Sequence, residues 1–163
     1  MGAGNVTVIV DETADLDAAA FKIMKSKTFD HATSCSSENA LVVVDEIYDI
    51  FFEKLFDCGG RLLDEQEKQT LEDSLWVNGK LNRQMLARDA EILCQMADLK
   101  RIDSTETKFL MVEESGIGPD YPFSGEKLSP VLSVYRASDF DDAQQTALNI
   151  LNHQGKGHSM GLH

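Results

Sequence analysis

The sequence predicts an α/β fold, in which a mostly parallel sheet carries helices on both faces. Two observations lead to this prediction. Short apolar runs recur along the 163-residue chain, and segments with apolar residues at helical spacing separate them. The length and the hydrophobic content of 42% suit one domain with a full core. We therefore expect residues 1–163 to form a single domain.

Four apolar runs are expected to be strands. They cover residues 5–10, 40–44, 108–112 and 131–135. The first run, NVTVIV, is rich in β-branched residues, and the second, ALVVV, is typical of a buried strand. The last residues, GKGHSMGLH, combine glycines with apolar residues and are expected to begin one more strand.

Helical spacing of apolar residues predicts helices over residues 16–27, 47–55, 64–75, 82–98 and 139–151. Thr13 or Asp15 can cap the first helix, because either side chain can accept hydrogen bonds from its unpaired N–H groups. Gly59 and Gly60 are expected to close the second helix. Residues 114–129 are expected to form a loop, because they contain GIGP and YP.

The charge and the cysteines limit the classes of partner. Asp and Glu number 28 against 15 Lys and Arg, so the net charge is −13, which disfavours nucleic acid and anionic membranes as partners. No apolar run approaches the roughly 20 residues of a membrane span. Cys35, Cys58 and Cys94 are widely spaced and form no CxxC, so neither a disulfide framework nor a metal site is expected. The cytoplasm is the expected compartment.

One cysteine stands in a polar setting. Cys35 lies in residues 29–39, between a helix pattern and a strand pattern, with serines on both sides. This setting suits a reachable thiol, and the alternative is a buried, inert cysteine. Cys58 and Cys94 fall in helix patterns and are expected to pack. A helix-to-strand loop lies at the amino ends of parallel strands, whereas ligands usually bind beyond the carboxyl ends. The Cys35 loop would therefore have to face a neighbouring domain.

Four segments carry a family resemblance: residues 2–5 (GAGN), 27–38 (KTFDHATSCSSE), 126–131 (EKLSPV) and 157–159 (GHS). In this order they resemble the catalytic, cysteine-bearing domain of the aldehyde dehydrogenase superfamily. The chain is most similar to the CoA-acylating branch, which includes acetaldehyde, propionaldehyde and sulfoacetaldehyde dehydrogenases. His31 and Ala32 stand where the acylating enzymes often have Asn and Gly.

The resemblance implies roles for individual residues. It implies that the Cys35 thiolate attacks an aldehyde, that NAD or NADP accepts the hydride, and that coenzyme A takes the acyl group from the thioester. It implies that Glu126 contacts the nicotinamide-side ribose. His31, Glu38, His158 and Asn5 are possible supporting residues. Glu38 and His31 as local hydrogen-bond anchors and His158 as a backbone cap remain alternatives, and no metal ligand is expected.

The resemblance also implies partners. In the superfamily a dinucleotide-binding domain precedes this segment, so we expect the cofactor-binding domain to be absent from this chain and the isolated chain to be inactive. The full-length enzyme is expected to be a homo-oligomer that oxidises a small aldehyde. Two alternatives stay open. One is a hydrolytic aldehyde dehydrogenase that yields a free acid, whose water-activating glutamate would align at about Met1. The other is a folded domain without catalytic function.

Overall fold

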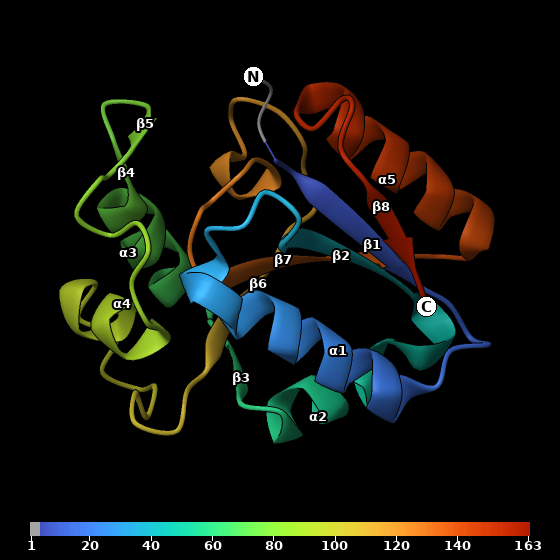
Figure 1. The fold of residues 1–163 in the computed structure, drawn as a ribbon, viewed down its shortest axis with the longest axis horizontal. Helices are drawn as coiled ribbons and strands as arrows, with labels where there is room; N and C mark the ends of the chain where they lie inside the picture. The colour runs from blue at the N-terminus through green and yellow to red at the C-terminus, as the bar shows by residue number, and fades with distance from the viewer. Residues whose placement is uncertain (1–3) are drawn as a thin grey trace.

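A six-stranded parallel sheet forms the centre of the computed structural model, which describes residues 4–163 (Figure 1). Each pair of neighbouring strands is parallel. From one edge to the other, the strands are β3 (Gly60–Leu62), β6 (Phe109–Glu113), β7 (Val131–Ala137), β2 (Glu38–Val44), β1 (Val6–Val10) and β8 (Met160–Leu162). The predicted parallel sheet is confirmed, including the strand expected near the end of the chain.

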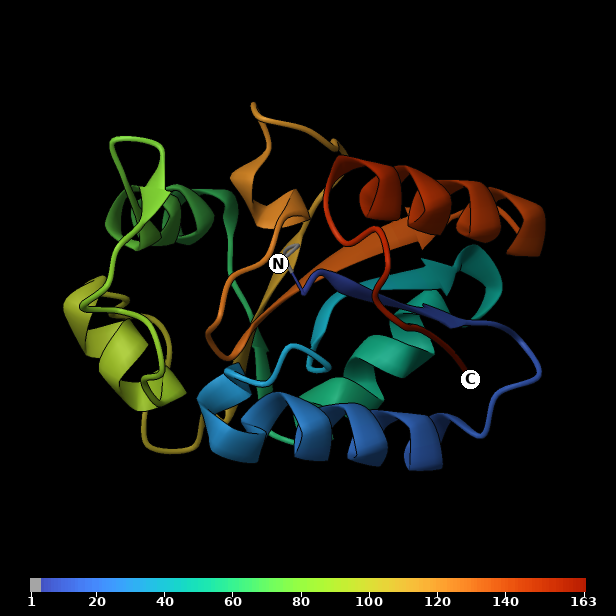
Figure 2. The ribbon, with the colours of Figure 1, turned by 45° about the horizontal axis from the view of Figure 1, so that its top comes forward.

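Helices lie on both faces of this sheet, as predicted (Figure 2). Helices α1 (Leu16–Thr28) and α2 (Tyr48–Asp57) cover one face, and α5 (Phe140–His153) covers the other. Helices α3 (Glu65–Leu75) and α4 (Ala90–Met96) pack next to β6, and together with side chains of that strand they bury a second apolar cluster. Within residues 4–163, no helix has the length and apolar character needed to cross a membrane.

The strands β1 and β2 explain why the apolar runs are continuous. Every residue of β1 is buried, and so is every residue of β2 after Glu38. A strand covered by helices on both faces has no solvated side, so apolar side chains are favoured at successive positions. Val10, Leu41 and Val43 have no solvent-exposed surface, which places the core along these strands.

Local side-chain bonds define where the helices begin and end. Asp15, one of the two predicted caps of α1, accepts a hydrogen bond from the Ala18 N–H at 3.0 Å. The Thr13 hydroxyl instead donates to Asp11. Helix α3 begins with a capping box, and Gly59 follows α2 with a φ of 96°, a conformation that glycine adopts without strain.

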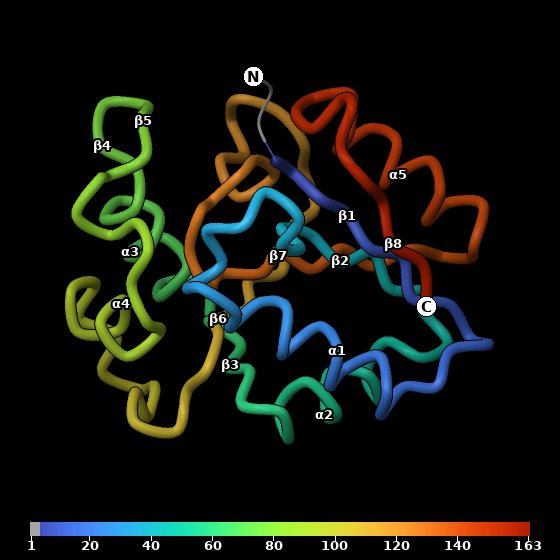
Figure 3. The backbone as a smooth tube through the Cα atoms, in the orientation of Figure 1, coloured from blue at the N-terminus to red at the C-terminus, as the bar shows by residue number. Residues whose placement is uncertain are grey.

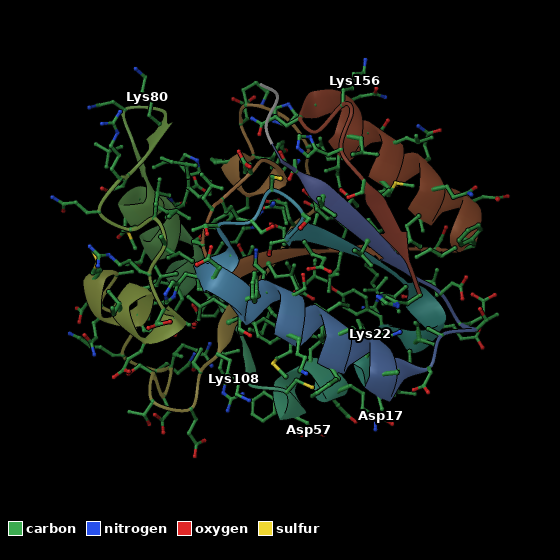
Figure 4. All side chains as sticks on the ribbon, in the orientation of Figure 1. Asp17, Lys22, Asp57, Lys80, Lys108 and Lys156 are labelled. Carbon is green, nitrogen blue, oxygen red and sulfur yellow. The ribbon has the colours of Figure 1, made fainter. Side chains whose placement is uncertain are left out.

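The expected helix over residues 82–98 is wrong in its first half. A short hairpin of β4 (Trp76–Val77) and β5 (Lys80–Leu81) precedes turns over residues 82–88, and only α4 is helical. The Asn82 side chain accepts from the Gln84 N–H at 3.1 Å, and Ala87 has a φ of 54°. Such local bonds compete with the helix, so the apolar residues here reach the core from turns. Figure 4 shows Lys80 pointing away from the body of the fold at the hairpin.

Residues 4–163 also contain three short 3-10 helices: η1 (Phe29–Ala32), η2 (Asp45–Ile47) and η3 (Pro122–Ser124). The strand β3 was not predicted, because it is short and its first residue, Gly60, was expected to close the preceding helix. The predicted loop over residues 114–129 is confirmed, apart from the single turn of η3. Helix η1 lies just before Cys35 in the sequence, and η3 lies just before Glu126, so both stand next to candidate site residues.

Candidate active site

The Cys35 loop lies at the amino ends of the strands, against Gly4, which stands two residues before β1 (Figure 3). A Cβ atom on Gly4 would be 2.8 Å from the Cys35 carbonyl oxygen and 2.9 Å from its Cα. Only glycine allows this approach, because both obstacles are backbone atoms. The loop therefore occupies the edge of the sheet expected for it, opposite the edge where parallel sheets usually bind ligands.

Glu126 joins Cys35 at the same place. Its Oε1 accepts a hydrogen bond from the Gly4 N–H at 2.8 Å, and it would be 2.9 Å from the Cβ of a residue at position 4. The loop before β7 thus holds a half-buried carboxylate next to the Cys35 backbone. The two residues, 91 positions apart in sequence, are neighbours because both contact Gly4.

Asn39 links these segments through its side-chain amide. Its Nδ2 donates to the Gly4 carbonyl oxygen at 2.8 Å, and its Oδ1 accepts from the Lys127 N–H at 3.0 Å. The side chain is buried, and it completes a ring that runs through Gly4, Glu126 and Lys127. Sequence reasoning did not single out Asn39.

Asn5 fixes the same segment to the loop around η3. Its Nδ2 donates to the Ser124 carbonyl oxygen at 2.8 Å, and the residue is fully buried. Nearby, the Gln154 side chain accepts from the Glu126 N–H at 3.1 Å. The Asn5 Oδ1 has no hydrogen-bond partner among the described residues. Asn5 therefore supports the loop that bears Glu126.

Two lysines lie buried beneath the site. The Lys27 ammonium donates to the Glu38 carbonyl oxygen at 2.7 Å, and Lys127 donates to the carbonyl oxygens of Phe123 and Gly125. Neither forms an ion pair within residues 4–163. Burial lowers the pKa of Lys27 from 10.5 to about 7, and burial together with the nearby Lys27 lowers the pKa of Lys127 well below its ordinary value.

Its nearness to Cys35 in sequence makes Lys27 a possible activator of the thiol, whereas sequence reasoning missed Lys127. A lysine among the apolar positions of the first helix pattern was a usable signal for Lys27. For Lys127, which follows Glu126 in a loop, no such signal exists.

The other predicted residues divide between two places. Glu38 begins β2, and its Oε2 is buried without a partner among the described residues. His158 precedes β8 at the same edge, and its Nδ1 is likewise buried without a partner in this part of the chain. His31 is exposed, and its Nδ1 lies 2.8 Å from the Asp89 carboxylate at the start of α4. The fold thus collects Asn5, Cys35, Glu38 and Glu126 at one edge and gives His31 a contact with α4.

The three thiols differ in access. Cys35 is exposed, Cys58 is partly buried, and Cys94 is buried. Burial raises the pKa of the Cys94 thiol to about 11, so very little of it ionises near neutral pH. Cys35 is the thiol that a substrate could reach.

Comparisons with known proteins agree with this arrangement. Residues 1–64 match the aldehyde dehydrogenase family. The whole chain is 48% identical to a sulfoacetaldehyde dehydrogenase (acylating) of Cupriavidus necator, of which it covers 33%. It superimposes over its full length on 36% of an acetylating aldehyde dehydrogenase from Geobacillus thermoglucosidasius, with a TM-score of 0.95 and 37% identity. Over its whole length, the chain is similar to members of the aldehyde dehydrogenase superfamily.

A third similarity concerns a structure with a ligand. A propionaldehyde dehydrogenase from Rhodopseudomonas palustris, solved with bound propionyl-CoA, has a TM-score of 0.85 and 26% identity. The alignment covers 98% of this chain and 34% of that protein. Within the superfamily, the chain therefore resembles the acylating dehydrogenases, and it spans about a third of the length of these relatives.

The turn before Cys35 contains the two departures from the acylating pattern, His31 and Ala32. Asp30, His31 and Ala32 have left-handed φ angles of 48°, 53° and 58°. Asn and Gly, which acylating dehydrogenases often have at the last two positions, tolerate this conformation best. Here the His31–Asp89 contact and the bond from the Thr33 hydroxyl to the Asp30 carbonyl oxygen, at 2.7 Å, help to hold the turn. Of the family segment at residues 2–5, Gly2 and Ala3 lie outside the described residues.

The exposure of the thiols predicts an order of alkylation. At about pH 8, iodoacetamide should modify Cys35 first, Cys58 more slowly and Cys94 last, because burial blocks access and the pKa of Cys94 is raised. Mass spectrometry of peptides sampled over time measures the three rates. Modification of Cys58 or Cys94 before Cys35 would contradict an accessible Cys35 loop.

Burial of Lys27 predicts a dependence of stability on pH. Between pH 7 and 10.5 the unfolded chain binds a proton at Lys27 that the folded chain releases, so the free energy of unfolding should rise with pH in this window. Lys27→Met should make the rise smaller. Urea-induced unfolding at about pH 7, 8 and 9 measures it.

The matched control is Lys22→Met, which changes an exposed lysine of the same helix, labelled in Figure 4. This variant should keep the full pH dependence. Equal slopes for Lys27→Met and Lys22→Met would show that Lys27 keeps an ordinary pKa in the folded chain.

Proposed function

We propose that residues 1–163 are the catalytic, cysteine-bearing domain of a CoA-acylating aldehyde dehydrogenase that uses NAD or NADP. The observation that carries this proposal is the exposed Cys35 in a loop that contacts, through Gly4, the carboxylate of Glu126. The similarity over the whole chain to dehydrogenases named acylating supports coenzyme A, rather than water, as the acyl acceptor.

Cys35 carries the covalent chemistry in this proposal. Its thiolate adds to the carbonyl carbon of an aldehyde, and the carbonyl oxygen takes up the negative charge. The carbon then loses its hydrogen as hydride and becomes the carbonyl carbon of a thioester on Cys35. The thiol of coenzyme A, on losing its proton, attacks this carbon, takes the acyl group and releases the Cys35 thiolate. The backbone N–H of Cys35 is the proposed donor to the oxyanion.

Glu126 fits a role in holding the dinucleotide. Its carboxylate is fixed at one oxygen by the Gly4 N–H and lies beside the Cys35 backbone, where it can accept hydrogen bonds from ribose hydroxyls. NAD or NADP, when bound there, supplies the acceptor for the hydride. Asn5 holds the loop around η3, the Glu38 carbonyl oxygen accepts from Lys27 at the start of β2, and His158 lies before β8; these residues are proposed to support the site.

The working enzyme is proposed to combine this domain with a cofactor-binding domain, as a homo-oligomer in the cytoplasm that acts on a small aldehyde. The relatives that the chain matches are about three times as long, which supports the need for further structure. Three free cysteines suit a reducing compartment.

Replacement of Cys35 tests the reaction in the complete enzyme. Cys35→Ser should lower acyl-CoA formation by at least about a thousandfold, because the serine hydroxyl is a far weaker nucleophile than a thiolate. Chromatography of acyl-CoA together with NADH absorbance measures both products. Cys58→Ser is the matched control and should retain activity. Retained activity in Cys35→Ser would remove Cys35 from the reaction, and NADH formation that needs no CoA would favour the hydrolytic alternative.

The isolated chain should produce no NADH or NADPH from an aldehyde and coenzyme A, because we expect the cofactor-binding domain to lie outside residues 1–163. Absorbance at the nicotinamide band measures this, and circular dichroism shows that the sample is folded. A rate above background that Cys35→Ser abolishes would show that residues 1–163 suffice for the whole cycle.

A further inference from the structure

Gly4 determines how far Cys35 lies from Glu126. It contacts the Cys35 backbone on one side, and its N–H binds the Glu126 carboxylate on the other. Two hydrogen bonds position Gly4 itself: the N–H bond to Glu126, and the bond that its carbonyl oxygen accepts from Asn39. Asn39 is therefore the side chain that fixes Gly4 from the side of the cysteine loop.

The other end of the Asn39 amide reaches the Glu126 loop directly. Its Oδ1 accepts from the backbone N–H of Lys127, the residue next to Glu126. One side chain thus holds the segment before β1 and the loop before β7 at once. The Lys127 ammonium, bound to the carbonyl oxygens of Phe123 and Gly125, keeps that loop in its conformation.

The backbone of β2 presents Asn39 in an unusual way. In the pairing of β1 with β2, Val6 lies opposite Glu38 and Thr7 lies opposite Ala40, so Asn39 is the extra residue of a β-bulge. A bulge interrupts the alternation of side chains and redirects the residue it contains, and such bulges are common beside active sites. Asn39 stands four residues after Cys35 in the sequence, and its redirected side chain binds the Gly4 carbonyl oxygen.

We infer that Asn39 is a positioning residue, which sets the separation between Cys35 and the Glu126 carboxylate. The inference rests on the proposed function for its kinetic consequence, because Cys35 and Glu126 act on the aldehyde and the dinucleotide. Asn39 itself contacts neither the aldehyde nor the dinucleotide in this proposal. It acts through Gly4 and Lys127.

The chemistry of the contacts requires an amide. Asn39 is 4% exposed, so both backbone groups that it binds are shielded from water. A carboxylate at this position keeps the acceptor for the Lys127 N–H but loses the donor, and it would face the carbonyl oxygens of Gly4 and Ser37, which Nδ2 now binds. Asn39→Asp therefore breaks the link to Gly4 with almost no change in size.

Asn82 provides a matched control. Its Oδ1 accepts from the Gln84 N–H and its Nδ2 donates to the Ser74 carbonyl oxygen, so its amide also joins two backbone groups, but it lies beside the β4–β5 hairpin. Asn82→Asp repeats the chemical change away from the site. Asn39→Gln keeps the amide and serves as the conservative variant.

In the complete enzyme, Asn39→Asp should lower kcat/KM for the dinucleotide about a hundredfold, the loss expected when reacting groups are displaced by about 1 Å. Part of the loss should be a raised KM for the dinucleotide. Asn82→Asp should stay within about threefold of the parent, and Asn39→Gln should recover part of the loss. An equal effect of both Asp variants, or none at Asn39, would overturn the inference.

A second measurement separates this inference from the proposed function. In residues 1–163, hydrogen exchange followed by NMR should accelerate at the Gly4 amide about tenfold in Asn39→Asp and stay unchanged in Asn82→Asp. If the parent enzyme lacks CoA-dependent aldehyde oxidation, the proposed function fails and this exchange decides the role of Asn39. Faster exchange at Gly4 then supports the link, and unchanged exchange overturns it.

Discussion

The close approach of Gly4 to the Cys35 backbone is the constraint on which the candidate site depends. No side chain fits between them, so the start of β1 can lie directly on the cysteine loop. The same residue binds Glu126 through its N–H and Asn39 through its carbonyl oxygen. Three segments that are far apart in sequence meet at one glycine, and the parallel sheet supplies the geometry, because β1, β2 and β7 all begin at this edge.

This edge combines an apolar sheet with buried polar groups, and each group has a physical function. Backbone carbonyl oxygens turned inward by the two loops need donors, since burial without a hydrogen bond is costly. Lys27 supplies one for Glu38, and Lys127 supplies one each for Phe123 and Gly125. Burial lowers the pKa of both lysines, because the charged form loses its hydration. These hydrogen bonds fix the conformation of the loops, whereas burial removes part of the hydration that stabilises the charged form of each lysine.

The sequence predicts the fold better than it predicts the site's supporting residues. Long apolar runs such as residues 40–44 and helix caps such as Asp15 depend on local patterns, and the structure confirms them. The helix expected from residue 82 fails because Asn82 binds its own neighbours, a competition that apolar spacing does not reveal. Asn39 and Lys127 escape prediction for a different reason. The role of Asn39 depends on a bulge and on a bond to the Lys127 N–H across 88 positions, which no window of sequence contains. The Lys127 side chain binds carbonyl oxygens only two and four residues away, but its burial depends on the packing of the fold and is not visible in the sequence.

The polar groups at the carboxyl ends of the strands and those at the amino ends differ in how completely they are paired. At the carboxyl ends of β6 and β7 lies a cavity of about 520 Å³, at the edge where parallel sheets usually bind ligands. Two pairs of its polar side chains bind each other: Lys68 pairs with Glu114 at 3.3 Å, and the Tyr48 hydroxyl donates to Glu113 at 3.0 Å.

At the amino edge, the pairing is incomplete within residues 4–163. The Asn5 Oδ1, the Glu38 Oε2 and the His158 Nδ1 are buried there without hydrogen-bond partners, close to the exposed Cys35. Buried polar atoms in proteins normally have hydrogen-bond partners, so these atoms are available for further hydrogen bonds. The proposed function brings substrate and cofactor to this same amino edge, where the exposed thiol lies.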